Sequence, residues 1–81
     1  MDSYARRHLT GRRDHAAQQA EASKNAIIAV FERNRDSVHL ITVSDWATIA
    51  RTAVEGAHYA AQAEALSDAL AADPEDTARS N

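Results

Sequence analysis

Two stretches of the chain place small or apolar residues at the spacing of one helix face. In residues 14–34 the residues with this spacing, which alternates between four and three, are Ala16, Ala20, Ser23, Ile27 and Val30. Side chains spaced in this way lie on one side of an α-helix. The stretch is also rich in Ala and Gln and contains neither Gly nor Pro, which favours a helix. We therefore predict a helix over residues 14–34.

Residues 37–43 have a different character, because Val38, Leu40, Ile41 and Val43 are aliphatic or β-branched. Such a run is typical of a β-strand. A single strand leaves backbone donors and acceptors unsatisfied unless it finds a partner. The segment therefore either pairs with the same segment of a second copy about a two-fold axis, or forms an extended loop over the end of a hairpin. Both alternatives predict a strand-like connector.

The strongest local signal begins a second helix. Thr42 and Asp45 have the spacing of a capping box, and Ile41 and Trp46 that of a hydrophobic staple. Pro74 follows at the other end, and the residue before a proline disfavours helix. We predict a helix over residues 43–72, an antiparallel helical hairpin of the all-α class, and a disordered acidic tail over residues 73–81.

The second helix has two partial apolar stripes. At seven-residue spacing the first combines two series, Trp46, Ala53, Ala60 and Ser67 with Ile49, Gly56, Ala63 and Leu70. The second runs toward a different side through Tyr59, Ala63, Leu66 and Leu70. A helix with two apolar sides usually has two neighbours.

These stripes predict that Trp46 and Ile49 belong to the hairpin core. For contact with a partner or a second copy they indicate Tyr59, Leu66 and Leu70, together with Leu40 and Ile41 of the connector. The alternative role for all of them is packing inside the hairpin, which is usual for leucines at helical spacing.

The amino-acid composition indicates that a single hairpin would bury little apolar surface and would need to associate. The 81 residues include no cysteine, and 19 alanines account for much of the 44% hydrophobic content. Leu, Ile, Val and Phe make up only 13 of the 81 residues. This fraction is below the level of about 20% that is typical of globular chains. A small chain without disulfides and with few bulky side chains often needs oligomerisation. We expect a dimer or a higher helical oligomer.

Charge is divided unevenly within the net value of −3. Residues 1–40 hold seven Lys and Arg against five Asp and Glu, and residues 41–81 hold two against seven. Two halves of opposite net charge would attract each other in an antiparallel hairpin or in a head-to-tail pair of chains. Residues 1–13 read as a flexible basic arm, which either contacts nucleic-acid phosphates or is simply solvated; its candidate phosphate contacts are Arg6, Arg7, Arg12 and Arg13.

The only metal-like motif is Glu55 with His58, a carboxylate and an imidazole at i and i+3. Di-iron helical bundles use such pairs, and an antiparallel hairpin would bring Glu21 opposite. The first helix lacks the companion motif, so a solvated helix face explains the pair equally simply. No cysteine nucleophile or Gly-rich phosphate loop is present. We therefore expect no enzyme, no cofactor and no metal.

The sequence thus predicts a small oligomeric helical regulator that binds and modulates a protein partner, as an inhibitor or adaptor. A dimeric nucleic-acid-binding regulator, or an oligomer with ligand or metal sites at its interfaces, are the alternatives. The run of apolar residues at 26–31 is too short to span a membrane, so we expect a soluble cytoplasmic protein. Eight arginines to one lysine suggest a bacterial or phage origin.

Overall fold

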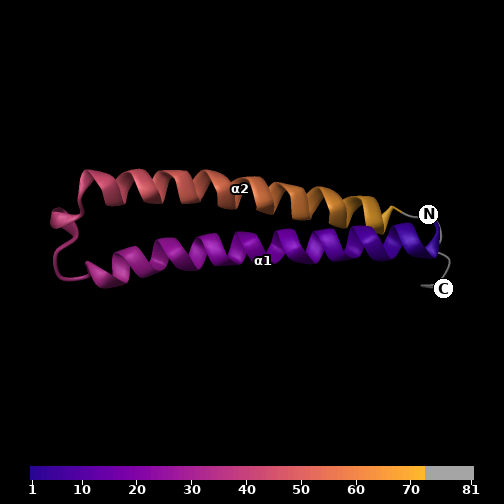
Figure 1. The fold of residues 1–81 in the computed structure, drawn as a ribbon, viewed down its shortest axis with the longest axis horizontal. Helices are drawn as coiled ribbons and strands as arrows, with labels where there is room; N and C mark the ends of the chain where they lie inside the picture. Colours follow the sequence, from indigo (N-terminus) through magenta and orange to yellow (C-terminus); the bar gives the residue numbers. More distant parts are fainter. Residues whose placement is uncertain (73–81) are drawn as a thin grey trace.

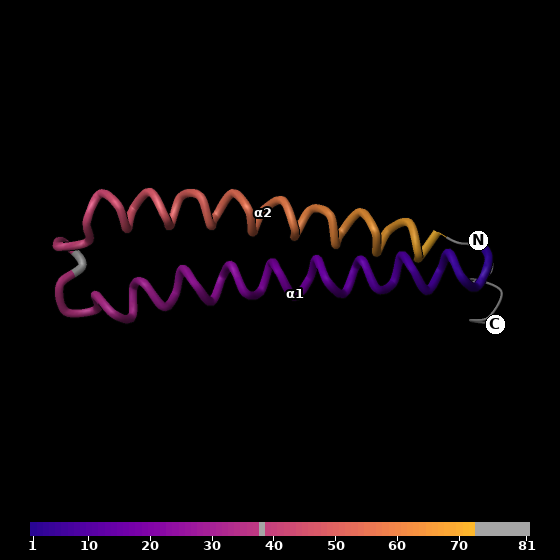
Figure 2. Tube along the Cα trace, in the orientation of Figure 1, coloured from indigo at the N-terminus to yellow at the C-terminus, as the bar shows by residue number. Residues whose placement is uncertain are grey.

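The chain forms a hairpin of two long antiparallel helices (Figure 1). A computed structural model describes residues 1–72, apart from the side chain of Val38. Helix α1 spans Ser3–Arg33, a single 3-10 turn η1 spans Val38–Leu40, and helix α2 spans Val43–Ala71. The molecule measures 55 × 20 × 15 Å, so it is a rod in which the two helices run side by side. Figure 2 shows the end of α2 beside the start of α1.

Helix α1 begins at Ser3, so the flexible arm predicted for residues 1–13 is instead the first part of a helix. The side chain of Asp2 caps it by accepting a hydrogen bond from the Ala5 N–H at 2.7 Å. Gly11 costs about 1 kcal/mol relative to alanine in a helix, but it does not end α1. The Asp2 cap and the half-buried Leu9 lie on the N-terminal side of Gly11 and stabilise the part of α1 that precedes it.

The connector satisfies its backbone groups locally, in place of the strand-like segment predicted for residues 37–43. Asn34 ends α1, and its side-chain amide donates to the Val30 carbonyl at 2.8 Å. Two turns follow, in which the N–H of Ser37 donates to the Asn34 carbonyl and that of Leu40 to the Ser37 carbonyl, at 2.9 and 2.8 Å. Residues 1–72 contain no β-strand, because these short-range bonds form without a second strand.

Helix α2 confirms the predicted start and ends within one residue of the predicted end. The Thr42 hydroxyl accepts a hydrogen bond from the Asp45 N–H at 3.0 Å, the forward bond of the expected cap. Ile41, just before the cap, is buried. Trp46 meets the ring of Phe31 edge to face at a centroid distance of 6.0 Å. The tail predicted for residues 73–81 lies outside the described residues.

Most of the buried and half-buried positions form one stripe on each helix with a spacing of four and three, as in an antiparallel coiled coil; the half-buried helix residues outside the stripes are Ala5, Arg6, Thr10, Gln19, Phe31 and Gln62. On α1 they are Leu9, Arg13, Ala16, Ala20, Ser23, Ile27, Val30 and Asn34. On α2 they are Asp45, Ile49, Thr52, Gly56, Tyr59, Ala63, Leu66 and Leu70. The face predicted for the first helix is confirmed.

The prediction for the second helix is correct for one series and wrong for the other. Ile49, Gly56, Ala63 and Leu70 face α1, whereas Trp46, Ala53, Ala60 and Ser67 are exposed. The second series that faces α1 is instead Asp45, Thr52, Tyr59 and Leu66, which alternate with the series from Ile49 to Leu70. Tyr59, Leu66 and Leu70 therefore belong to the stripe that packs on α1, and not to a separate side.

The helices approach closely where Gly56 of α2 faces Ser23 of α1. A Cβ atom added at Gly56 would lie 2.9 Å from the Ser23 Cβ, a distance that real Cβ atoms essentially never show. A Cβ added at Gly11 would meet nothing within 4 Å. Small residues at the middle of the seam thus allow a close approach, in which dispersion contacts between backbone and Cβ atoms replace bulky side chains.

The two glycines provide a matched test of this contact. Replacing either with alanine improves helix propensity by about 1 kcal/mol, but overpacking at Gly56 opposes the gain by about 1–3 kcal/mol. We expect Gly11→Ala to raise the free energy of unfolding, and Gly56→Ala to fall below Gly11→Ala by about that overpacking cost. Urea unfolding followed by circular dichroism measures both. Equal stabilisation by the two substitutions would contradict the close approach.

Candidate functional site

Two grooves flank the contact stripe on opposite sides of the hairpin. On α2, Ala53, Ala57 and Ala60 line one groove, whereas His58 and Gln62 line the other. At 100° per residue these two sets fall on either side of the line through the stripe. Each groove therefore presents the chemistry of one flank of the hairpin.

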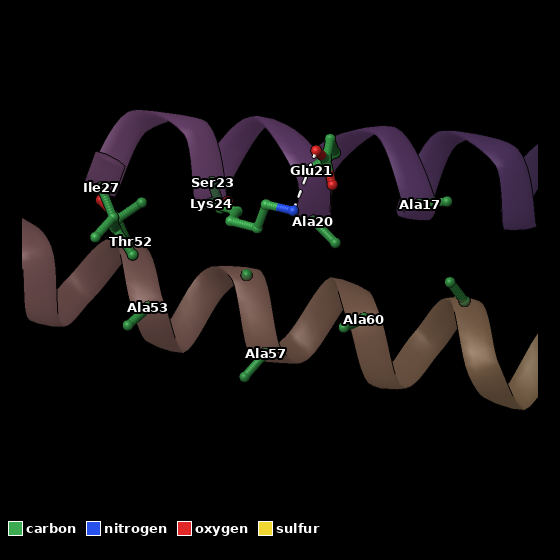
Figure 3. Close-up of a pocket in the computed structure, with 12 residues that line it drawn as sticks. Ala17, Ala20, Glu21, Ser23, Lys24, Ile27, Thr52, Ala53, Ala57 and Ala60 are labelled. Atoms are coloured by element: carbon green, nitrogen blue, oxygen red, sulfur yellow. Dashed lines mark ion pairs between the residues drawn. The ribbon is translucent and has the colours of Figure 1, made fainter. Parts of the chain in front are cut away.

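The first groove, called the alanine groove, has a volume of about 620 Å³ and is lined chiefly by Ala17, Ala20, Ile27, Ala53, Ala57 and Ala60. In Figure 3 Ala20 of α1 points toward α2, whereas Ala53 and Ala57 of α2 point away from α1. Ser23 and Gly56, where the helices approach closely, also line it. Because its walls are mostly methyl groups, the groove offers a smooth apolar surface that a second helix could approach closely.

One ion pair borders the alanine groove. The Lys24 ammonium lies 3.4 Å from a Glu21 carboxylate oxygen, both side chains being more than half exposed (Figure 3). An exposed pair of this kind contributes little to the stability of the hairpin. Its two opposite charges do, however, give this flank a positive and a negative point beside each other.

Bulky apolar side chains continue the same flank toward the turn. Ile28 follows Glu21 and Lys24 at helical spacing on α1 and is 46% exposed. Trp46 precedes Ala53 and Ala60 at seven-residue spacing on α2 and is 47% exposed. The flank is therefore small and apolar along the groove, and bulky and apolar at the turn end. Together the alanine groove, Ile28 and Trp46 form what we call the apolar face.

The turn end itself exposes two further aliphatic side chains. Leu40 is 64% exposed and Val43 is 87% exposed. They flank the α2 cap at Thr42, whose bond to Asp45 fixes the backbone between them and the helix. These two residues, called the turn patch, form an exposed apolar tip.

The second groove, called the basic groove, has a volume of about 570 Å³. Its lining from α1 is Arg7, His8, Gly11, Arg12 and His15, and from α2 it is His58, Tyr59 and Gln62. The Tyr59 ring lies at the centre of an aromatic cluster, with centroid distances of 6.5 Å to His15 and 5.6 Å to His58, both edge to face. Among residues 1–72, those that line this groove include no acidic side chain.

The structure divides the four arginines that the sequence grouped as possible phosphate contacts. Arg7 and Arg12 are exposed and line the basic groove. Arg6 is half-buried, and Arg13 is half-buried with its guanidinium bonded to Asp14 at 3.1–3.2 Å. Only Arg7 and Arg12 of these four therefore share one groove.

The three metal candidates are not brought together. Glu21 borders the alanine groove with Lys24, whereas His58 lines the basic groove on the other flank. Glu55 is exposed and lines neither groove. Within residues 1–72 no group of three His, Cys, Asp or Glu side chains is placed to hold a metal ion.

Most residues predicted for association are packed within the single chain. Leu70 is 3% and Ile41 8% exposed, and Tyr59 and Leu66 are half-buried. Leu40 alone of the five is freely exposed. The alanine groove was missed because Ala57 and Ala17 lie off the stripes read from the sequence. The only signal for them was the excess of alanine.

Comparisons with protein-family models, with curated proteins and with solved structures found no match to this chain. No helix in the described part is long and apolar enough to cross a membrane. The geometry of the two grooves and the turn patch is therefore the basis for a functional assignment.

The position of Leu70 can be checked by comparing two leucines. Leu70→Ala removes a buried side chain and is expected to lower the free energy of unfolding by about 2–5 kcal/mol. Leu40→Ala removes an exposed one and should change it by less than about 0.5 kcal/mol. Both are measured by denaturant unfolding at one fixed chain concentration. Similar losses at the two positions would contradict the packing described.

Proposed function

We propose that this chain is a small helical interaction protein that acts as a homo-oligomer and binds and modulates a protein partner. The observation that carries the proposal is that few apolar side chains are buried while several large ones are exposed. Among residues 1–72 only Ala16, Val30, Ile41 and Leu70 are buried apolar residues, whereas bulkier ones such as Trp46 lie about half exposed. Exposed apolar surface on a small protein commonly marks an interaction site.

Self-association is assigned to the apolar face. Two copies related by a two-fold axis would place alanine groove against alanine groove, which builds a four-helix arrangement from two hairpins. The methyl-lined walls permit close packing, and Ile28 and Trp46 would cover the ends of the interface. A two-fold contact is self-complementary, so Glu21 of one copy and Lys24 of the other supply opposite charges at the rim.

Partner binding is assigned to the turn patch, because Leu40 and Val43 lie outside both grooves. The turn patch is apolar, exposed and located at one end of a rod. In a two-fold assembly of hairpins, side-to-side contact leaves the ends of the rod open. The protein would thus present apolar tips to a partner, as an adaptor or an inhibitor does.

The self-association proposal is tested with two pairs of alanines on α2. Ala57→Lys with Ala60→Lys places two charges in the alanine groove, where desolvation opposes association. Ala61→Lys with Ala65→Lys adds the same charge at exposed positions outside both grooves. We expect light scattering to give a multiple of the chain mass for the wild type and the control, and a single-chain mass for the groove variant.

The emission of Trp46, the only tryptophan, should shift to shorter wavelength as the wild type associates. The groove variant should lack this shift while keeping its helical circular dichroism. A wild type that remains a folded single chain at every concentration would overturn the assignment of the apolar face.

The partner proposal is tested by affinity capture from an extract of the organism that carries the gene. We expect a protein retained by the wild type to be lost with Leu40→Ser and Val43→Ser, since two exposed apolar contacts are removed without disturbing the Thr42 cap. The variant with Ala61→Lys and Ala65→Lys, whose substitutions lie at exposed positions away from the tip, serves as a control with the tip intact. Retention by the serine variant would place the partner elsewhere.

A further inference from the structure

The basic groove has no part in the proposed association, since it lies on the opposite flank from the alanine groove. It combines residues from distant parts of the sequence, Arg7 and Arg12 near the start of α1 and His58 in the middle of α2. No local motif places them together. The antiparallel packing of the two helices does so, and the result is a concave surface with permanent positive charge.

Within residues 1–72 no acidic side chain is paired with the two arginines of the groove. Arg13 is bonded to Asp14 and Lys24 is paired with Glu21, but neither Arg7 nor Arg12 pairs with an acidic group among residues 1–72. None of the described residues that line the groove is acidic. Unpaired guanidinium groups that share a concave site form a strong donor set for an anion, because each offers planar, forked N–H donors.

The backbone leaves room between these donors. His8, Arg12 and His15 lie at i, i+4 and i+7, along one line of α1. Gly11 lies next to this line and lines the groove, and a Cβ there would meet nothing within 4 Å. With no side chain of its own, Gly11 exposes the backbone of α1 to the groove beside Arg12. It is not needed for close packing of the helices, unlike Gly56.

We propose that the basic groove binds a phosphate group, with Arg7 and Arg12 as its principal donors. Forked hydrogen bonds from arginine match the geometry of phosphate oxygens, and the imidazoles of His15 and His58 add N–H donors from both helices. The volume of about 570 Å³ falls within the range of ligand pockets, about 300–1,000 Å³, and exceeds what an isolated inorganic ion fills.

The aromatic cluster points to the kind of molecule that carries the phosphate. Tyr59 and its two histidine neighbours border the same groove as the arginines. Cationic grooves with aromatic rings bind nucleotides by combining phosphate contacts with stacking of the base. The ligand is thus a phosphate attached to a flat ring, which is either a free nucleotide or a residue of a single strand of nucleic acid.

The two glycines serve as internal reporters, since Gly11 lines the basic groove and Gly56 the alanine groove, and the chain has no others. Amide ¹H–¹⁵N spectra of the full chain are recorded during separate titrations with ATP, with inorganic pyrophosphate and with a thymidine oligonucleotide. We expect the Gly11 signal to move in a saturable way while the Gly56 signal stays in place. Movement of neither signal by any of the three probes would overturn the proposal.

The three probes separate the sources of the phosphate. Saturation by ATP and pyrophosphate at low concentration identifies a small phosphate ligand. Saturation by the oligonucleotide alone, weakening steeply as salt is raised, identifies a strand whose phosphates displace counterions. Both outcomes support a phosphate site in this groove. Movement of Gly56 together with Gly11 would instead reflect a change throughout the hairpin and would count against it.

Two arginine pairs provide the matched variants. Arg7→Gln with Arg12→Gln is expected to weaken binding by about tenfold or more, since each removes charge-assisted hydrogen bonds. Arg35→Gln with Arg51→Gln removes the same charge from exposed residues outside the groove and should leave affinity within about twofold. All four side chains are exposed, so circular dichroism should remain helical. Equal weakening in the two variants would overturn the assignment to this groove.

Discussion

The close approach of the two helices at Ser23 and Gly56 is the constraint on which the rest of the structure depends. With only 2.9 Å between the Ser23 Cβ and a Cβ at Gly56, the middle of the seam has no space for large side chains. Ala20 on α1 and Ala63 on α2 keep other parts of the seam small. The most deeply buried large residues, Val30, Ile41 and Leu70, lie toward the two ends.

This constraint also explains why so much apolar surface remains outside. A seam of small residues buries little area per residue, and hydrophobic stabilisation grows with the area removed from water. The larger side chains that the seam has no room for, such as Trp46 and Val43, lie exposed around the turn. A hairpin built in this way gains stability from any neighbour that covers its apolar face, so folding and association are linked through mass action.

The seam separates two surfaces of different chemistry. On one flank the residues next to it are alanines, which gives a methyl-lined groove. On the other they are arginines and histidines, arranged about the half-buried Tyr59. The uneven division of charge along the sequence contributes to this contrast, because the basic first half supplies both arginines of the basic groove. Binding to one flank would leave the other open, so the two proposed functions do not compete for a surface.

Interactions between residues close in the sequence determined much of the fold, so the sequence alone was enough to predict it. The face of α1, the Thr42 cap and the two ends of α2 were all predicted, because spacing and capping act within a few residues. The start of α1 was not, because Gly11 disfavours a helix and the cap at Asp2 was recognised only in the structure.

Only the tertiary structure decided which stripe of α2 faces α1. Alanine occurs on every side of this helix, so several faces have nearly equal apolarity, and the sequence favoured Trp46 and Ala53 over Thr52 and Tyr59. The pairing of Ser23 with Gly56 selects among these faces, because it is set by shape complementarity between the helices and not by hydrophobicity along one of them. Both grooves follow from that choice, since each combines side chains that meet only after the helices have packed.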